Sequence, residues 1–437
     1  MIKLPLKFQE TMKEILKDDY DKFLESYNKP VYNGIRMNSL KITPEEYMSL
    51  TGTQPEPVPW NDLGFYCENA KSVSRNPLYY AGLYYIQEPS AMMPAQMLPV
   101  EPGDIVLDMC AAPGGKSTAL AAKLQGEGLL ISNDISYSRA KALLRNIEAF
   151  GVKNSLVISE NPKNLASRLP EYFDKILIDA PCSGEGMFHK KPGMVESWEK
   201  TGPEFYSEIQ REIICYGAEM LKPGGYMVFS TCTFSPLEDE GTIAYFLEKH
   251  PEFTLEKEVH IWPHEVKGEG HYVTLLKKAD DDYTRRKKSY PFTRAPKEIQ
   301  AFFDFLKDAG IQTKFDEKRL VVNGDHVYYL PEDMIDISGL RVLRCGWYLG
   351  NIKKNRFEPS GAFAVGLSKD ECKNIIDIPY TDANAVKYLK CETLEVDDSL
   401  KNGWYLVCTS GYPLGWGKLN RGTLKNKYPA GWRWQSN

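Results

Sequence analysis

Short apolar runs alternate with amphipathic stretches through the middle of the chain, between residues 101 and 280. The apolar runs predict five strands, at Ile105–Leu107, Leu129–Ser132, Leu156–Ile158, Lys175–Ile178 and Tyr226–Ser230. Apolar residues at helical spacing predict helices at Ser117–Leu124, Ser138–Phe150 and Glu204–Leu221. Such alternation is typical of a parallel sheet with crossover helices, so we expect an α/β fold with a doubly wound, Rossmann-like sheet.

The patterns on either side of this core predict further domains. A chain of 437 residues is too long for one ordinary core. Helical spacing of apolar residues begins near Phe8, whereas the Pro-rich segment 54–60 excludes a helix or a central strand. The charged segment 277–296 is typical of a linker, and helices are expected at 301–310 and near 368–376. The expected domains are 1–75, an α+β extension; 76–279, the α/β core; 280–375, a linker with an α+β domain; and 376–437, a β-rich domain.

Composition narrows the class of protein. No apolar stretch approaches the ~18–20 residues needed to cross a bilayer, and the N-terminus lacks the pattern of a signal peptide. We therefore expect a cytoplasmic protein without a membrane partner. The nine cysteines have irregular spacing, with no CxxC pair and no zinc-like spacing to histidine, so neither a disulfide framework nor a metal is expected. Nothing in the pattern demands more than a monomer.

Charge is distributed unevenly along the chain. The net charge is −5, yet residues 401–437 carry six Lys and Arg residues and no Asp or Glu, so the rest of the chain sums to −11. A short cationic segment on an acidic body suits a local contact with nucleic-acid phosphates. A basic tail that only improves solubility explains the composition equally well.

A loop of small residues follows the first predicted strand, in the sequence IVLDMCAAPGGKSTALAAKL at 105–124. Ligands can approach the backbone closely where side chains are small, and the amides of the following helix add polar contacts. A dinucleotide site would need GxGxxG, and a P-loop would need glycine where Cys110 stands. A loop that binds S-adenosylmethionine fits better, because it predicts an acidic residue about 20 residues further on, and Asp134 is there.

Two cysteines follow the last two predicted strands. Asp179 and Cys182 lie in the sequence DAPCSG, and Cys232 lies in STCT. Ligands bind at the carboxyl ends of strands in a doubly wound sheet, so these residues share an edge with the small-residue loop. Thiols there suit covalent catalysis: a thiolate that adds to C6 of cytosine makes C5 nucleophilic toward a methyl donor. Asp179 suits a contact at N3 of the base, and Cys182 suits proton removal or release.

Three motifs in this order resemble those of the Sun/Fmu-type RNA 5-methylcytosine methyltransferases. They are DMCAAPGGK at 108–116, FDKILIDAPCSGEG at 173–186 and FSTCTFSPLEDE at 229–240. The stretches RMNSLK at 36–41 and YYIQEPSAMMPAQML at 84–98 resemble sequences upstream of that catalytic core. Residues 411–434 resemble the PUA-like domain of the RsmF-like bacterial branch, which methylates 16S ribosomal RNA. The resemblance covers nearly the whole chain.

The resemblance implies a class I methyltransferase core and assigns roles to individual residues. Cys232 would be the nucleophile, and Cys182 would assist release of the methylated RNA. The implied substrate is a cytosine near the decoding centre of the small-subunit rRNA. Residues implied or expected to bind S-adenosylmethionine are Cys110, Ala111, Ala112, Pro113, Gly114, Gly115, Lys116, Asp134, Asn161 and Asp179. Residues expected to contact RNA are Arg36, Asn38, Lys418, Arg421, Lys425, Lys427 and Arg433.

Some positions depart from the family pattern or allow two interpretations. Asn161 stands where the family usually has an aspartate near the adenine, and its side-chain oxygen could still accept a hydrogen bond from the adenine amino group. His264 and His271 are expected at the surface or in the core rather than in the pocket. The four tryptophans beyond residue 400 suit stacking on RNA, but we expect at least two of them in the core of a small β-domain.

Three other functions compete with cytosine-C5 methylation. An N-methyltransferase acting on RNA or protein would need no thiol. A non-catalytic RNA-binding assembly factor would keep the core only as a scaffold. A P-loop nucleotidase is the weakest alternative, because its motif is incomplete.

Overall fold

The computed structural model describes residues 3–283, 289–292, 296–354 and 356–434. An eight-stranded mixed sheet forms its centre, with the strand order β13-β6-β5-β4-β7-β8-β10-β9. Strands β4 to β8 run parallel, whereas β10, β9 and β13 are antiparallel to their neighbours. The bounds are β4 Ile105–Asp108, β5 Leu129–Asn133, β6 Ser155–Ile158, β7 Phe173–Asp179, β8 Leu221–Thr231, β9 Phe253–Ile261, β10 His271–Lys278 and β13 Val342–Cys345.

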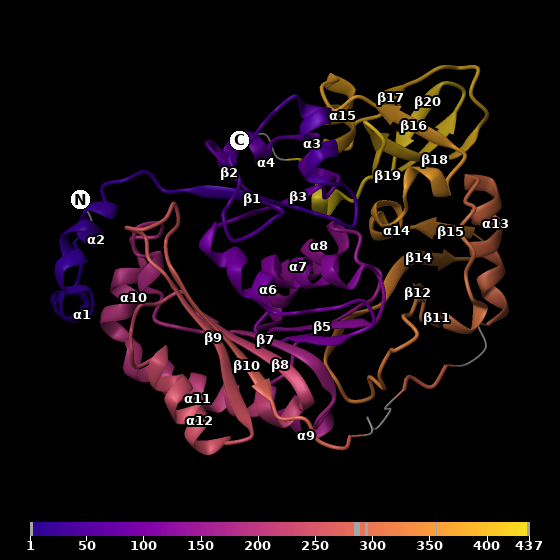
Figure 1. The fold of residues 1–437 in the computed structure, drawn as a ribbon. Helices are drawn as coiled ribbons and strands as arrows, with labels where there is room; N and C mark the ends of the chain where they lie inside the picture. Colours follow the sequence, from indigo (N-terminus) through magenta and orange to yellow (C-terminus); the bar gives the residue numbers. More distant parts are fainter. Residues whose placement is uncertain (1–2, 284–288, 293–295, 355, 435–437) are drawn as a thin grey trace.

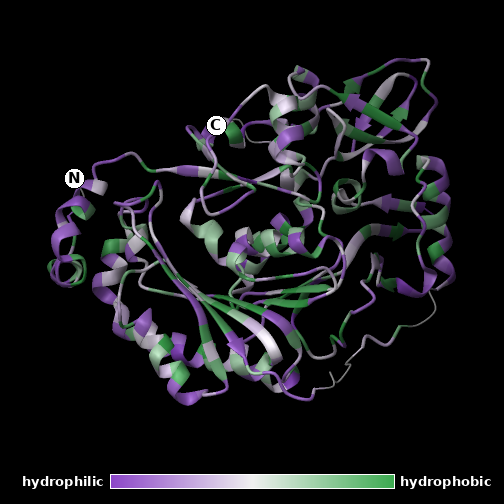
Figure 2. Cartoon of the chain, viewed as in Figure 1, coloured by the Kyte–Doolittle hydropathy of each residue, from purple (hydrophilic) through white to green (hydrophobic). Residues whose placement is uncertain are grey.

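Helices cover both faces of the sheet (Figure 1). Alternate strand residues explain this layering, since Leu107 and Ile131 pack toward α9, α11 and α12, whereas Val106 and Leu130 pack toward α6, α7 and α8. Figure 2 shows the resulting concentration of hydrophobic residues along the central strands. The bounds are α6 Met93–Met97, α7 Gly115–Leu124, α8 Tyr137–Ala149, α9 Pro162–Arg168, α10 Met194–Lys200, α11 Pro203–Met220 and α12 Glu240–Lys249.

The predicted core elements are present within a few residues of their expected bounds, which confirms the doubly wound fold. One detail differs: the strand expected from Tyr226 begins earlier, because residues 222–225 belong to β8, which begins at Leu221. The pairing of β8 with β7 shifts register between Phe173 and Lys175, so the strand absorbs the Pro-Gly-Gly sequence as an irregularity. The strand order reverses between β4 and β7, which is where such sheets bind ligands.

The N-terminal extension consists of short helices and a three-stranded antiparallel sheet of order β2-β1-β3. The predicted first helix is present, and the Pro-rich segment 54–60 contributes only an isolated bridge at Pro57. Tyr84 and Leu83 are buried at the sheet. The bounds are α1 Leu6–Leu16, α2 Tyr20–Ser26, β1 Asn33–Met37, α3 Pro44–Thr51, β2 Gly64–Cys67, α4 Ala70–Ser74, α5 Pro77–Tyr80 and β3 Tyr84–Gln87.

The region after the core is not separate from it, because β13 pairs with β6 at the edge of the central sheet. The expected helix at 301–310 is α13, Gln300–Ala309, but the helix expected near 368–376 is absent. That segment forms one 3-10 turn at Lys369–Glu371, and a strand follows. The expected linker overlaps β10 at Lys277 and Lys278, and its residues 284–288 and 293–295 lie outside the described residues. The remaining elements are β11 Leu320–Asn323, β12 His326–Tyr329, β14 Trp347–Lys353, β15 Arg356–Pro359 and α14 Gly361–Gly366.

The C-terminal β-rich unit packs against the N-terminal extension. Ile35 and Tyr84 share one hydrophobic cluster with Tyr388 and Leu424, and the rings of Tyr80 and Trp434 stack with centroids 5.0 Å apart. The small sheet of the N-terminal extension and the C-terminal unit therefore lie side by side next to the central sheet (Figure 1). Among the described residues, no helix is long and apolar enough to span a membrane. The bounds are β16 Ile375–Ile378, α15 Ala383–Leu389, β17 Leu394–Glu395, β18 Gly403–Thr409, β19 Tyr412–Asn420 and β20 Thr423–Asn426.

Candidate active site

A cavity of about 400 Å³ opens at the carboxyl ends of β4, β7 and β8. Its lining brings together the small-residue loop, Asp179 and Cys232, which lie far apart in the sequence. Side chains from β3 and from the start of β10 close its other sides. The segment that follows Cys182 also contributes, so that the additional lining residues include Tyr85, Gln87, Glu88, Met187, Lys190, Lys191, Gly270 and His271.

Hydrogen bonds and backbone geometry hold the small-residue loop in shape. Gly114 has a φ of +112°, a conformation that side chains disfavour, and α7 begins at the next residue. Ser117 donates a hydrogen bond of 2.6 Å from Oγ to Asp108 Oδ2. Thr118 donates from Oγ1 to the carbonyl oxygen of Gly114. The loop is therefore a rigid feature with little side-chain bulk.

The residues present fit S-adenosylmethionine. The cavity volume falls in the usual range for small-molecule sites, and the small residues Ala111, Ala112 and Gly115 line it. The Oδ1 atom of Asp108 is buried and has no hydrogen-bond partner, so it remains available to a polar ligand group. Burial raises the pKa of this carboxyl to about 7. Burial also raises the pKa of the Cys110 thiol well above its usual value, so Cys110 is neutral.

Asp179 lies between two basic side chains at the end of β7. Lys116 Nζ is 2.7 Å from Asp179 Oδ2, and His271 Nε2 is 3.6 Å from Oδ1. Ser230 also donates a hydrogen bond to Oδ1. Burial opposes ionisation of the Asp179 carboxyl, but Lys116 and His271 outweigh it and hold its pKa well below the usual range. Asp179 is therefore a carboxylate, which accepts hydrogen bonds.

Cys232 lines the cavity, and Cys182 lies behind it, outside the lining, with its sulfur against that of Cys232. Their Sγ atoms are 3.4 Å apart, and both side chains are partly exposed. The neighbouring sulfur of Cys232, together with burial, raises the pKa of the Cys182 thiol well above its usual value. Cys182 therefore keeps its proton and can donate it to a hydrogen bond with Cys232.

Two buried glutamates join the loops that carry the cysteines. Glu238, which follows Cys232 in the sequence, accepts a hydrogen bond of 2.9 Å from the backbone N–H of Ser183. Glu185, which follows Cys182, accepts one of 3.0 Å from the N–H of Phe234. Sequence reasoning missed both, although the acidic residues in the two motifs were a visible signal.

A close backbone approach also joins these loops. The N–H of Gly186 donates to the carbonyl oxygen of Cys232 over 2.9 Å, and a Cβ at Gly186 would meet that oxygen at 3.0 Å. Only glycine fits here without displacing the backbone of Cys232. The distance between the two sulfurs is thus determined by contacts of the loops rather than by the cysteines alone.

Gly114 faces α8 rather than the cavity, and two further predicted cofactor contacts, Asp134 and Asn161, also lie away from the cavity lining. Asp134 is buried after β5, accepts a hydrogen bond from Ser136 N, and lies 3.4 Å from Arg139 Nη2. Arg139 also donates to the carbonyl oxygen of Ala112, which links Asp134 to the loop. The side-chain oxygen of Asn161 caps α9 by accepting from Lys163 N. The contacts of both residues with S-adenosylmethionine remain predictions.

The expected RNA contacts divide into two groups. Arg36 and Asn38 are 3% and 1% exposed, so they do not present donors to RNA in this structure. Arg36 donates to Gly115 O, Gln87 and Thr118, and Asn38 donates to the carbonyl oxygens of Gly82 and Phe150. The prediction that they contact RNA is therefore corrected: in this structure their hydrogen bonds hold the segment 36–38 against the core. The C-terminal basic residues are all exposed: Lys418, Arg421, Lys425, Lys427 and Arg433.

We expect Arg36→Met to lower the free energy of unfolding by about 2–4 kcal/mol, because it removes buried, charge-assisted hydrogen bonds. Urea denaturation measures the change. Lys425→Met, at an exposed position, is the control and should change stability by no more than about 0.5 kcal/mol. An Arg36→Met protein with unchanged stability but weaker RNA binding would restore the original interpretation of Arg36.

The burial of one histidine and two tryptophans can be compared with the sequence predictions. His271 is buried at the cavity rather than in the core or at the surface, so that prediction was wrong. Trp404 and Trp416 are buried in a core cluster with Phe305 and Phe363, which confirms a core role for two tryptophans. Within the described residues, no group of His, Cys, Asp and Glu is arranged to hold a metal ion.

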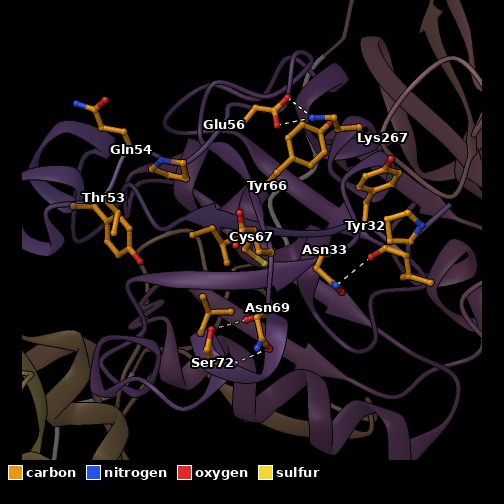
Figure 3. Close-up of a pocket in the computed structure, with 17 residues that line it drawn as sticks. Tyr32, Asn33, Thr53, Gln54, Glu56, Tyr66, Cys67, Asn69, Ser72 and Lys267 are labelled. Carbon is orange, nitrogen blue, oxygen red and sulfur yellow. Dashed lines mark hydrogen bonds and ion pairs between the residues drawn. The ribbon is translucent and has the colours of Figure 1, made fainter.

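A larger cavity, of about 910 Å³, lies in the N-terminal extension (Figure 3). Tyr32 and Tyr66 line it, and Lys267 from the core bridges to Glu56 at its rim. It contains neither the small-residue loop nor Cys232. We therefore place the chemistry in the smaller cavity.

The fold and this cavity define a class I methyltransferase, the class that takes its methyl group from S-adenosylmethionine. Residues 95–281 match the model of the 16S rRNA methyltransferase RsmB/F family. Three further models match: the N-terminal domain of 16S rRNA methyltransferase RsmF at 4–89, its first C-terminal domain at 304–367 and its PUA domain at 376–434. The chain belongs to the family of ribosomal RNA small subunit methyltransferase F.

Named relatives agree with this assignment. The chain is 31% identical to ribosomal RNA small subunit methyltransferase F of Shewanella loihica, over 98% of this chain and 95% of the relative. It is 32% identical to the protein of that name from Shewanella oneidensis, over 94% of this chain and 92% of the relative. Among solved structures, a methyltransferase homolog protein from Pyrococcus horikoshii is 28% identical in sequence, with a TM-score of 0.54. The match covers 61% of this chain and 93% of the chain in that structure.

Proposed function

We propose that this protein transfers a methyl group from S-adenosylmethionine to C5 of a cytosine in 16S ribosomal RNA, through a covalent bond between Cys232 and C6. The observation that carries the proposal is the position of Cys232. Its side chain lines the same cavity as the small-residue loop and Asp179, and lies 3.4 Å from a second thiol. A methyltransferase that acts on nitrogen has no need of this arrangement.

Each side chain has a chemical task in this proposal. Cys232 adds to C6 as a thiolate, and the hydrogen bond donated by the Cys182 thiol stabilises that thiolate. Asp179, as a carboxylate, accepts a hydrogen bond from the base. This acceptor role suits the exocyclic amino group on C4 better than the N3 contact expected from the sequence, because an ionised carboxylate has no proton to share with N3. After methyl transfer, Cys182 assists removal of the C5 proton and release of the RNA.

When bound, S-adenosylmethionine supplies the methyl group. The backbone of Cys110–Lys116 would surround it, and Asp108, Asp134 and Asn161 would provide polar contacts. We further propose that the protein acts in the cytoplasm as a monomer, on rRNA within the small ribosomal subunit.

Mapping 5-methylcytosine in ribosomal RNA tests the function directly. Bisulfite sequencing of 16S rRNA from cells with and without this protein should show at least one cytosine that is protected only when the protein is present. The same rRNA from cells that express Cys232→Ala should match the deletion strain. Methylation found only on nitrogen by mass spectrometry would contradict the proposal.

Basic residues of the C-terminal unit are proposed to bind the RNA backbone. Lys418 and Lys425 are directly opposite one another on β19 and β20, and both are exposed. Like charges in this arrangement repel, which an intervening phosphate would relieve.

The double substitution Lys418→Ala with Lys425→Ala should weaken RNA binding and reduce the slope of log affinity against log salt by about 1 for each lost phosphate contact. Filter binding at several salt concentrations measures both quantities. Lys249→Ala on α12, an exposed lysine in the helical layer of the core, is the control. An unchanged salt slope would show that these lysines do not contact phosphate.

A further inference from the structure

His271 is a buried histidine in the catalytic cavity that the proposed chemistry leaves without a role. It is 4% exposed and begins β10, the strand that pairs with β8 beside Cys232. Neither ring nitrogen makes a hydrogen bond of ordinary length: Nε2 is 3.6 Å from Asp179 Oδ1, and Nδ1 has no partner. Leaving a buried polar group unsatisfied costs free energy, so an imidazole in this state that faces a ligand cavity points to a contact made when the ligand binds.

The proposed reaction needs a proton donor close to this position. Addition of a thiolate to C6 pushes electron density through C5 and C4 onto N3, and N3 must then gain a proton. Asp179 is a carboxylate and cannot supply it. Lys116 is 2.7 Å from Asp179, and an ammonium group is a much weaker acid than an imidazolium.

We propose that His271, as an imidazolium, donates the proton that N3 of the target cytosine gains when Cys232 adds to C6. The inference rests on the proposed covalent function. The contact of 3.6 Å between His271 Nε2 and Asp179 Oδ1 places a donor beside an acceptor. N3 and the amino group on C4 are neighbours on the edge of cytosine, and they present an acceptor beside a donor. The pair of side chains therefore complements that edge, and it does not complement uracil.

The step balances in protons and electrons. The Sγ–C6 bond forms from the thiolate electron pair, N3 takes the proton of His271, and the imidazole becomes neutral. After methyl transfer, Cys182 Sγ takes the C5 proton as its own proton passes to the departing Cys232 sulfur, the electrons of the C5–H bond form the C5=C6 bond, and the Sγ–C6 bond breaks. The N3 proton then returns to His271 and the Cys232 thiol loses its proton to solvent, so the site begins the next turnover in its original state.

Several charged or titratable groups surround His271 in the cavity. Asp179 from β7 lies 3.6 Å from its Nε2, and Lys116 from α7 pairs with the same carboxylate. The others that line the cavity are Tyr85, Glu88, Asp108, Cys110, Lys190, Lys191 and Cys232.

Single-turnover methylation of 16S rRNA by the full chain tests the inference. His271→Gln should lower the rate by about 10²–10⁴-fold, the usual range for a general acid, with little change in RNA affinity. The wild-type rate should fall at alkaline pH as the imidazolium loses its proton, and the variant should lack that limb. Added imidazole should partly restore the rate of His271→Gly, which a merely structural histidine would not permit.

Controls separate this inference from the proposed function. His264→Gln, outside the cavity, should retain the wild-type rate and pH profile. RNA with 5-fluorocytidine at the target should form the Cys232 adduct slowly in His271→Gln. If the wild-type protein methylates C5 but His271→Gln reacts at the wild-type rate, only the role of His271 is overturned. If the wild-type protein forms no adduct and no 5-methylcytosine, the proposed function itself fails.

Discussion

Cys232→Ala is expected to reduce methyl transfer to 16S rRNA by at least about 10⁴-fold, the scale of losing a catalytic nucleophile. The reason is chemical: without the sulfur, C5 of cytosine stays a poor nucleophile. Incorporation of radiolabelled methyl groups measures the rate, and RNA with 5-fluorocytidine at the target should form no covalent complex with this variant.

Cys215→Ala provides a matched control for this experiment. Cys215 is also a partly exposed free thiol, but it lies on α11 and does not line the cavity. That variant should keep the wild-type rate and still form the adduct. Full activity of Cys232→Ala would favour methylation at nitrogen, which needs no thiol.

Cys182→Ala should have the opposite signature, with a covalent complex between protein and RNA that accumulates. The variant keeps the nucleophile but loses the group 3.4 Å away that assists release. Denaturing gel electrophoresis after mixing with RNA and S-adenosylmethionine should show a slowly migrating band, with turnover reduced by about 10²-fold or more.

The double variant Cys182→Ala with Cys232→Ala tests which sulfur forms the bond. We expect no retarded band from it, because the Cys232 sulfur that bonds to C6 is absent. If Cys232→Ala alone trapped RNA and Cys182→Ala did not, the roles of the two cysteines would be exchanged.

Hydrophobic patterns within short segments were enough to predict most of the core strands and helices. The core strands and helices appear in the sequence because both faces of a parallel sheet are buried, which leaves short apolar runs between amphipathic helices. The same rule placed Asp179 and Cys232 at one edge, since ligand sites follow the carboxyl ends of strands. The helix expected near 368–376 failed because a strand that pairs with β18 begins at Ile375. That pairing is nonlocal, and helical periodicity does not detect it.

Predictions based on residue type alone were wrong where segments far away in the sequence bury the side chain. From the sequence, Arg36 is a plausible phosphate ligand. In the structure β1 lies against α7, and the buried guanidinium of Arg36 donates hydrogen bonds to Gly115 and Thr118. Burial lowers the pKa of Arg36 to about 10, so it still carries its charge. His271 was missed for the related reason that only the antiparallel register of β10 on β8 brings it to the cavity.

The sequence by itself determined the class of fold, the small-residue loop and the pair of thiols, because these depend on periodicity and on short motifs with contiguous residues. Tertiary structure alone decided the rest. It added β13 to the edge of the central sheet, joined the two flanking units in one hydrophobic cluster, and placed Lys116 and His271 on either side of Asp179. Each of these depends on contacts between segments far apart in the chain, whose free energies no local pattern records.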